Sequence, residues 1–293
     1  MHLLVFGLGY TGAAIAAAAA AAGWSVAATS RGGTGRFAVP FAQAGAEIAR
    51  ADAVVSTVPP GEADPVLAAW GPALRASPRL RWLGYLSTTG VYGDRGGAWV
   101  EETTPPAPGQ ARSRQRLAAE QGWREVAQGR PLDLFRVAGI YGPGRSYLDE
   151  VRAGTARRLH KPGQVFGRIH RDDIAGAVLA ALRQGAEQGA KQAGADGTRV
   201  LHLADDLPAA PAHVIAYAAG LLGLAPPPLL EFSAAALSPM AASFWAESRR
   251  VAAEHTQQAL GRRWRYPTYR EGLRGLLQQA VEGAAEQSEV AVA

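Results

Sequence analysis

Residues 3–12 read Leu-Leu-Val-Phe-Gly-Leu-Gly-Tyr-Thr-Gly, and an alanine-rich run from Ala13 to Ala22 follows them. Four consecutive apolar residues predict a buried parallel strand, and alanine is the strongest helix former. Between strand and helix, Gly7, Gly9 and Gly12 have the spacing Gly-x-Gly-x-x-Gly of a dinucleotide-binding turn. There the first glycine permits the bend, the second admits a pyrophosphate and the third lets the helix pack closely. The alternative is a turn that only connects the two elements.

The expected helix would present free N–H groups and its positive end to the phosphates, with Tyr10 and Thr11 in its first turn. The adenosine ribose should meet the end of the second strand. An acidic residue there would bind the 2′-hydroxyl of NAD, but this chain has Ser30 and Arg31. Arg31 can pair with a 2′-phosphate, so we expect NADP, with NAD as the alternative cofactor. Otherwise Arg31 is an ordinary surface arginine.

Composition narrows the classes of function. The 293 residues suit one two-lobed domain or two domains, and 48% hydrophobic against 19% charged residues indicates a globular chain. The net charge of +5 is spread over scattered arginines without a dense basic block, so we expect no nucleic-acid partner. With no cysteine there are no disulfides or thiolate ligands, which suits the cytoplasm. The scattered histidines indicate no metal site.

The apolar N-terminus does not have the pattern of a signal peptide. It lacks a basic segment before the apolar run, and cleavage after that run would remove the glycine turn. No apolar run reaches the length of roughly 18 residues that spans a membrane. We therefore expect no membrane partner.

Short apolar runs alternate with helical segments, which predicts an α/β fold with a doubly wound Rossmann sheet. After the first strand, the expected strands are Trp24–Thr29, Ala53–Val58, Trp82–Ser87 and Leu132–Val137, with a short remnant at Ala46–Ala49. Because little sequence separates Thr29 from Ala53, we expect a trimmed sheet edge on that side. Val58, at the end of its strand, is expected to complete the cofactor site.

We expect residues 1–145 to form the dinucleotide-binding lobe, with 162–183 returning to it, and 146–293 to form mostly a smaller substrate or cap lobe. The stretch Gln184–Gly197 is rich in Gly, Ala and Gln, which predicts a mobile surface loop. Residues 268–271, Thr-Tyr-Arg-Glu, have a capping-box pattern and predict the start of a last helix.

Four motifs together resemble the extended short-chain dehydrogenase/reductase superfamily, the NAD-dependent epimerase/dehydratase group. They are the glycine turn, residues 87–93 (Ser-Thr-Thr-Gly-Val-Tyr-Gly), residues 136–145 (Arg-Val-Ala-Gly-Ile-Tyr-Gly-Pro-Gly-Arg) and residues 169–174 (Ile-His-Arg-Asp-Asp-Ile). The resemblance covers nearly the whole chain. It implies that Thr88 orients a substrate oxygen and that Gly139 and Tyr141 border the cofactor.

The same resemblance implies a Tyr-x-x-x-Lys pair on a later helix, whose tyrosine would exchange the proton. Residues 112–120 align with that helix and place Arg112 at the tyrosine position and Arg116 at the lysine position. A guanidinium keeps its proton near neutral pH, so Arg112 cannot act as general acid and base. Arg116 could still bind a ribose. Arginines one helical turn apart share a face, which either holds a carboxylate or phosphate or simply lines solvent.

Other groups are candidates for the missing proton transfer. Tyr92 and Tyr141 follow strands at the ligand-binding edge, although buried tyrosines more often have a structural role. His170 precedes the predicted helix that starts with two acids, and histidine titrates near neutral pH; a structural histidine is the alternative. Arg145, in a Gly-Pro-Gly-Arg turn, would meet an anionic substrate or brace the turn.

These features leave two functional hypotheses. The first is a reductase-, epimerase- or dehydratase-type enzyme on a small, anionic substrate, with a homodimer as one expected form. The second is a catalytically degenerate NADP(H)-binding sensor or scaffold. The glycine turn and Thr88 favour the first, and the replaced Tyr/Lys pair favours the second.

Overall fold

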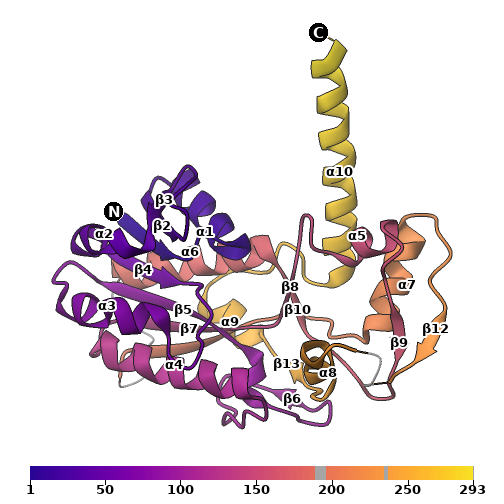
Figure 1. Cartoon of the computed structure of the whole chain (residues 1–293), viewed down its shortest axis with the longest axis horizontal. Coiled ribbons are helices and arrows are strands. Elements are labelled where there is room, and N and C mark those ends of the chain that lie inside the picture. The colour runs from indigo at the N-terminus through magenta and orange to yellow at the C-terminus, as the bar shows by residue number, and fades with distance from the viewer. Residues whose placement is uncertain (189–195, 234–236, 293) are drawn as a thin grey trace.

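A sheet of seven strands in the order β11-β7-β5-β4-β1-β2-β3 forms the centre of the computed structural model (Figure 1). The model describes residues 1–188, 196–233 and 237–292. Every neighbouring pair in the sheet is parallel, so all carboxyl ends lie at one edge, where ligands bind in such folds. Its strands are β1 (His2–Phe6), β2 (Ser25–Ser30), β3 (Ala38–Pro40), β4 (Ala53–Ser56), β5 (Trp82–Thr88), β7 (Leu132–Val137) and β11 (Thr198–Leu203).

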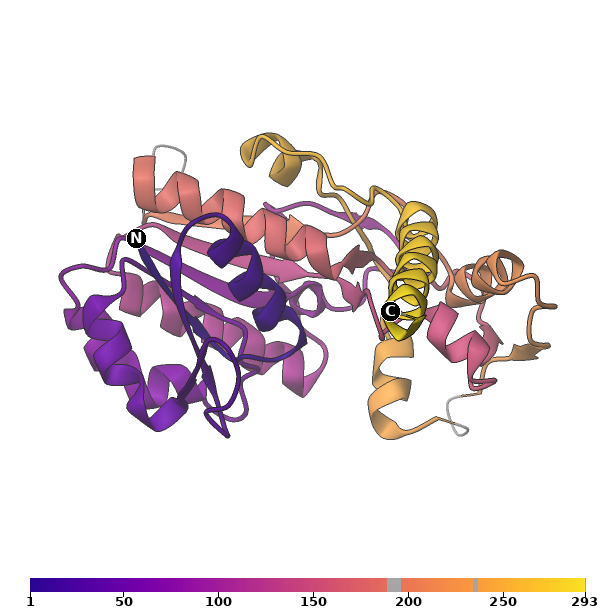
Figure 2. The same ribbon diagram turned by 90° about the horizontal axis from the view of Figure 1, so that it is seen from above.

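Helices cover both faces of the sheet, as Figure 2 shows from above. Successive residues of β1 alternate between two cores: Leu3 and Val5 pack with one set of helices, and Leu4 and Phe6 with the other. This double burial explains the continuous apolar run in the sequence. One layer contains α1 (Tyr10–Ala21) and α6 (Arg171–Gln188), and the other contains α2 (Ala44–Arg50), α3 (Pro65–Ala76) and α4 (Ala111–Ala127).

The C-terminal part adds a smaller group of elements beside the carboxyl edge of the sheet, and α10 stands out from the body (Figure 1). Leu148, Ile215 and Leu273, among others, form a separate core there. The short parallel pairs β8 with β10 and β6 with β13 lie between this group and the sheet, and β9 pairs with β12 inside the group. The remaining elements are η1 (Phe41–Gln43), η2 (Thr89–Tyr92), β6 (Trp99–Val100), β8 (Gly139–Tyr141), α5 (Tyr147–Arg152), β9 (Arg158–His160), β10 (Arg168–His170), α7 (Pro211–Leu221), β12 (Leu229–Glu231), α8 (Pro239–Trp245), β13 (Arg250–Val251), α9 (Glu254–Ala259) and α10 (Tyr269–Val292).

Two local predictions were wrong. Ala46–Ala49 lies inside helix α2, and the trimmed edge of the sheet is the three-residue strand β3. A short apolar run does not distinguish strand from helix, and alanine favours the helix. The predicted loop Gln184–Gly197 begins too early, because α6 continues to Gln188. Residues 189–195 of that stretch lie outside the described residues.

The predicted start of the last helix is confirmed, with half of the capping box formed, because the Thr268 hydroxyl caps Arg270 and not Glu271. The Glu271 carboxylate accepts from the Thr268 backbone N–H at 3.1 Å, and the Thr268 hydroxyl accepts from the Arg270 N–H at 3.1 Å. Over the described ranges, no helix is long and apolar enough to cross a membrane. Within the same ranges, no three His, Asp or Glu side chains gather as a metal-binding group.

Candidate functional site

The three glycines of the turn differ in whether protein atoms would contact a side chain at their positions. Gly7 has φ +97°, and a Cβ atom there would lie 2.7 Å from the Thr57 hydroxyl. A Cβ on Gly12 would lie 1.9 Å from the Gly7 carbonyl oxygen, so helix and turn pack with no space for a side chain. A Cβ on Gly9 would meet nothing within 4 Å. The fold therefore requires Gly7 and Gly12, whereas Gly9 leaves open space at the uncapped start of α1.

Side chains from neighbouring strands hold this turn. The Thr57 hydroxyl, directly after β4, donates to the Gly7 carbonyl at 2.9 Å. The Thr29 hydroxyl, in β2, accepts from the Gly7 N–H at 3.1 Å. Val58 also lies against the turn, since a Cβ on Gly7 would be 3.1 Å from its side chain. The sequence analysis missed Thr57, although its position after a strand that neighbours β1 was a usable signal.

The end of β2 and the loop that leads to β3 carry the residues expected at the ribose. The Ser30 hydroxyl accepts from the Gly33 N–H at 2.8 Å and so shapes the loop. Arg31 is exposed and makes no hydrogen bond or ion pair within the described part of the chain. Arg36, which the sequence analysis did not consider, is also exposed on this loop and lies over the Phe37 ring at 5.1 Å. The loop thus offers free guanidinium groups.

Tyr10 connects the start of α1 to the turn after β8. Its hydroxyl donates to the Pro143 carbonyl at 3.1 Å. The guanidinium carbons of Arg171 and Arg145 lie 4.9 and 5.8 Å from the centre of its ring. Burial raises the pKa of Tyr10. Thr11, next in the helix, is buried at 9% exposure.

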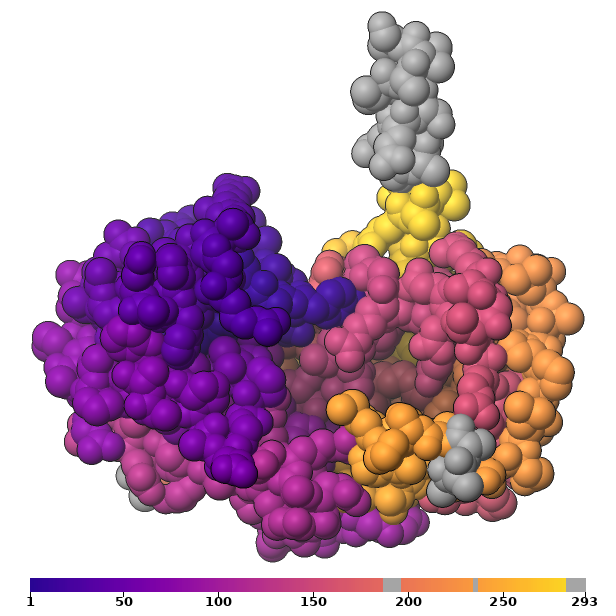
Figure 3. Space-filling model, viewed as in Figure 1, coloured from indigo at the N-terminus to yellow at the C-terminus, as the bar shows by residue number. Residues whose placement is uncertain are grey.

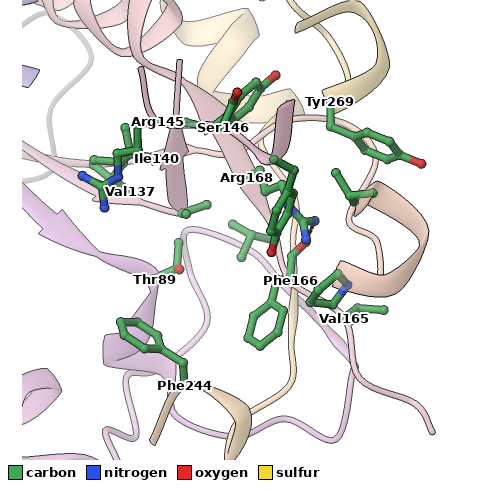
Figure 4. A pocket seen from close by; sticks show the side chains of 18 of the residues that line it. Thr89, Val137, Ile140, Arg145, Ser146, Val165, Phe166, Arg168, Phe244 and Tyr269 are labelled. Carbon is green, nitrogen blue, oxygen red and sulfur yellow. Dashed lines mark hydrogen bonds between the residues drawn. The ribbon is translucent and has the colours of Figure 1, made fainter. Parts of the chain in front are cut away.

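A cavity of about 620 Å³ lies between the carboxyl edge of the sheet and the C-terminal elements. Figure 3 shows the surface hollowed between α8, in light orange, and the pink segments that precede it in the chain. In Figure 4, Arg145, Phe244 and Tyr269 border the cavity on different sides. The walls also include residues of β5, α4, β7, β8 and α5, so the cavity is assembled from segments far apart in the sequence.

The structure divides the expected site residues into two groups. The cavity is lined by Thr88, Arg112, Gly139, Tyr141 and Arg145. The Thr88 hydroxyl accepts from the Gly90 N–H at 3.1 Å, which leaves its own proton free to donate. Three candidates for catalysis do not line this cavity, namely Tyr92, Arg116 and His170.

The two arginines of α4 have different surroundings. The Arg112 guanidinium lies on the Phe244 ring, 3.6 Å from its centre, and burial lowers the Arg112 pKa. Arg116 instead donates to the Leu86 carbonyl at 2.6 Å and to the Tyr85 hydroxyl at 3.2 Å. Arg116 therefore braces β5, and the two side chains do not form one anion-binding face on the cavity.

Tyr92 belongs to a buried polar network at the central sheet. Its hydroxyl accepts from Arg136 at 2.8 Å and lies 2.5 Å from Nε2 of His202. Arg136 also forms an ion pair of 2.8 Å with Glu120, which accepts from the Ser87 hydroxyl at 2.5 Å. Burial raises the pKa of Tyr92. The network joins β5, β7, α4 and β11. The contacts of Tyr92 therefore indicate a structural role.

His170 is fully buried between two aromatic rings. The ring centroids of Tyr141 and Tyr266 lie 5.2 and 4.2 Å from its own. Its Nδ1 accepts from the Asp172 N–H at 3.2 Å, and burial lowers its pKa to about 4. The ring is therefore neutral near pH 7. Tyr141 is 8% exposed, and burial raises the pKa of its hydroxyl.

Sequence reasoning missed three residues at the polar end of the cavity. Glu247 and Arg249 follow α8 and form an ion pair of 2.8 Å, and Arg249 also donates to the Gly93 carbonyl at 2.7 Å. Phe244, on α8, carries the ring under Arg112. No motif surrounds these residues, so the sequence held no local signal for them.

No protein-family model matches the chain. Two curated relatives align with part of it: Protein YeeZ of Escherichia coli, 32% identical over 145 residues, and a 3-diazoavenalumate denitrifying reductase of Streptomyces, 31% identical over 153 residues. The alignments cover 49% and 48% of this chain, and 47% and 45% of those proteins. The chain thus spans about half the length of the curated relatives it matches.

A solved structure from Silicibacter pomeroyi, that of a functionally unknown conserved protein, is 42% identical and has a TM-score of 0.85. The match covers 95% of this chain and 98% of that one. The chain belongs to the same family as this protein.

More distant solved structures share the fold. The human epimerase family protein SDR39U1 with NADPH is 19% identical, with a TM-score of 0.71 over 95% of this chain and 99% of that one. MoeE5 in complex with UDP-glucuronic acid and NAD is 18% identical, with a TM-score of 0.75 over 97% and 100%. The chain therefore has the Rossmann fold of the NAD-dependent epimerase/dehydratase proteins, as the sequence motifs predicted.

Proposed function

We propose that the chain is an NADP(H)-dependent oxidoreductase that acts on a small anionic substrate in the cavity. The observation that carries this proposal is the glycine turn, where Gly7 and Gly12 are filled by protein contacts and only Gly9 faces open space. A pyrophosphate needs that approach at a helix N-terminus. Structural neighbours solved with NADPH or NAD support the same assignment.

The residues present fit such a cofactor. The phosphates would lie at Gly9 and the start of α1, the ribose near Ser30, and a 2′-phosphate against Arg31. When bound, a nicotinamide supplies or accepts a hydride. Thr88 would orient a substrate oxygen by donating a hydrogen bond to it, and Arg112 would hold an anionic group. Because Arg112 keeps its proton near neutral pH, it orients the substrate and does not exchange protons with it.

A second function is favoured by a separate observation. Tyr92 and His170, the candidates for proton transfer, are fully buried in structural contacts. A protein that binds NADP(H) and a ligand without turnover, as a sensor, would have these features. The absence of cysteine agrees with a cytoplasmic location for either function.

Thermal unfolding with NADPH and NADH tests the cofactor assignment. A ligand present at 100 times its Kd stabilises the native state by about 2.7 kcal/mol, and we expect the larger shift with NADPH. Equal shifts would contradict the role of Arg31, and no shift with either cofactor would contradict the proposed function. Cofactor oxidation with a panel of carbonyl acids then separates the enzyme from the sensor.

A further inference from the structure

Four arginines line the cavity, and they differ in whether their charges are already paired. Arg249 forms its ion pair with Glu247. Arg145 is exposed and lies beside the start of α1, on the side of the glycine turn. Arg112 and Arg168 remain, and neither forms an ion pair with any residue that the structure describes. These two arginines are therefore the candidates for holding a ligand.

Arg168, in β10, is the buried member of this pair. The residue is 7% exposed, and its Nη1 atom donates to the Phe166 and Ala209 carbonyls at 2.9 and 3.0 Å. Its Nε and Nη2 atoms donate to no described residue, yet they are not enclosed by protein, because the side chain forms part of the cavity wall. Figure 4 shows this side chain among those around the space. Backbone carbonyls thus fix the guanidinium group while two of its donors stay available to the cavity.

No carboxylate among the described residues compensates the charge of Arg168. The Asp205 N–H donates to the Arg168 carbonyl at 2.5 Å, but burial raises the pKa of the Asp205 carboxyl to about 8, more than Arg168 lowers it. That carboxyl is therefore mostly protonated near pH 7. The acids of α5 in the cavity wall do not pair with Arg168 either, because Asp149 accepts from the Ser146 hydroxyl at 2.7 Å and Glu150 is exposed. A buried charge without a counter-charge costs free energy, and an anionic ligand removes that cost.

The two unpaired arginines belong to different walls of the cavity. Arg112, on α4, rests on the Phe244 ring, with its guanidinium carbon 3.6 Å from the ring centre. Arg168, on β10, lies 5.9 Å from the centre of the Tyr147 ring on α5. In Figure 4, Arg168 and Phe244 lie apart, on different sides of the space. A ligand that contacts both arginines therefore needs an anionic group at each of two ends.

We infer that the cavity binds a small molecule with two separate anionic groups, one held by Arg168 and the other by Arg112. Each group is a carboxylate or a phosphate, because a guanidinium group binds both in the same two-point manner. A cavity of about 620 Å³ has the size of a small-molecule site. The inference deepens the proposed function, on which it rests for its catalytic meaning, and adds Arg168 to the binding residues. Binding itself does not depend on turnover.

Isothermal titration of the full chain, with and without NADPH, tests the ligand class. The probes are succinate, glutarate and adipate, each paired with its monomethyl ester, then 3-phosphoglycerate paired with glycerate, and UDP-glucose. Each pair differs by one anionic group, and we expect at least one doubly anionic member to bind about tenfold tighter than its partner, as one charge-assisted contact implies. The pair with the largest preference identifies the second group as carboxylate or phosphate. No preference in any pair, or binding of UDP-glucose alone, would overturn the inference.

Variants locate the second anionic group. Arg168→Gln should bring the preferred probe down to the affinity of its singly charged partner, whereas Arg158→Gln should leave the preference unchanged. Arg158 is the matched control because it lies on β9 in the same lobe, donates to the Ala212 carbonyl at 3.3 Å and does not line the cavity. If thermal unfolding shows that Arg168→Gln is not folded, Arg168→Lys replaces it; lysine keeps the charge but loses the two-point contact, so the preference should fall. An unchanged preference in either folded variant would overturn the role of Arg168.

The same titrations separate this inference from the proposed function. If the chain does not bind NADPH but prefers the doubly anionic probes, the oxidoreductase is contradicted and the ligand class is supported. If it binds NADPH but shows no preference within the pairs, the ligand class is overturned and the cofactor assignment stands. Each measurement therefore decides one of the two statements.

Discussion

The cofactor turn and the cavity lie at the same edge of one sheet, yet they are built in different ways. Gly7, Gly9 and Gly12 fall within six consecutive residues, and their backbone geometry forms the turn. The cavity is formed by side chains that range from Thr88 to Leu273 along the chain. A site made from local backbone geometry can be identified from a motif, whereas a site made from distant side chains depends on the whole fold.

The largest expected effect concerns the buried network of Tyr92, Glu120 and Arg136. Arg136→Ala would leave Glu120 buried at 1% exposure without its ion pair. Breaking a buried pair in this way costs about 3–5 kcal/mol, so chemical denaturation should show a loss of that size. Arg75→Ala, on the exposed surface of α3, is the control and should change stability little. A loss under about 1 kcal/mol for Arg136→Ala would show that the fold does not depend on this ion pair.

A second effect separates a structural His170 from a catalytic one. The folded pKa of about 4 lies below the ordinary 6.5, so unfolding takes up a proton between these values. Stability from the neutral ring is therefore complete above pH 6.5 and is lost as pH falls to 4. We expect the wild type to lose about 3 kcal/mol relative to His170→Phe over this range.

Denaturation of both proteins across that pH range measures the difference directly. Comparison with the variant cancels the pH-dependent stability contributed by other groups. One of these is Asp205, because burial raises its pKa to about 8. If the free energy of unfolding changes with pH in the same way in the wild type and in His170→Phe, the assignment of His170 as a buried neutral ring is contradicted. Turnover that disappears in the variant at pH 7.5 without loss of structure would move His170 into the cavity chemistry.

The glycine turn offers a matched pair of smaller changes. Gly12→Ala places a Cβ atom 1.9 Å from the Gly7 carbonyl, and overpacking of this kind costs about 1–3 kcal/mol. Gly9→Val meets no atom within 4 Å of its Cβ, so the fold should remain while the valine occupies the pyrophosphate position. Thermal unfolding and NADPH titration of both variants are the measurements. Unchanged NADPH affinity in folded Gly9→Val would remove the turn from the site.

The smallest effect concerns cofactor choice. Arg31→Ala should weaken NADPH by about tenfold, or about 1.4 kcal/mol, because it removes a charge-assisted hydrogen bond to the 2′-phosphate. NADH affinity should stay the same, since NADH lacks that phosphate. Arg36→Ala serves as the comparison on the same loop. If only Arg36→Ala weakens NADPH, the 2′-phosphate lies further along the loop than the sequence predicted.

Most of the fold could be predicted from the sequence. Strand β7 has the predicted bounds Leu132–Val137, and all six of its residues are buried, including Asp133 and Arg136. The strand predicted at Ala46–Ala49 was wrong because an alanine-rich segment shows no periodicity that separates a strand from a helix. Local propensity and burial together were sufficient for the central strands of the sheet but not for its edge strand β3.

The cavity shows where such reasoning stops. Thr88 and Arg112 were found because a motif places them on β5 and α4, and both line the cavity. Glu247 and Phe244 come from a segment without a motif, and their position depends on how the chain returns past α4. Arg112 and Arg116 are one helical turn apart, but Arg116 donates a hydrogen bond to the Leu86 carbonyl. The spacing of the two residues does not predict this contact.

Tyr10 contacts both the glycine turn and the wall of the cavity. It starts the helix at the glycine turn, its hydroxyl holds the Pro143 carbonyl, and its ring supports Arg145 at the cavity wall. If a bound cofactor moves the Tyr10 ring, it changes the contact of that ring with Arg145. By thermodynamic reciprocity, whatever factor the first ligand imposes on the affinity of the second, the second imposes on the first.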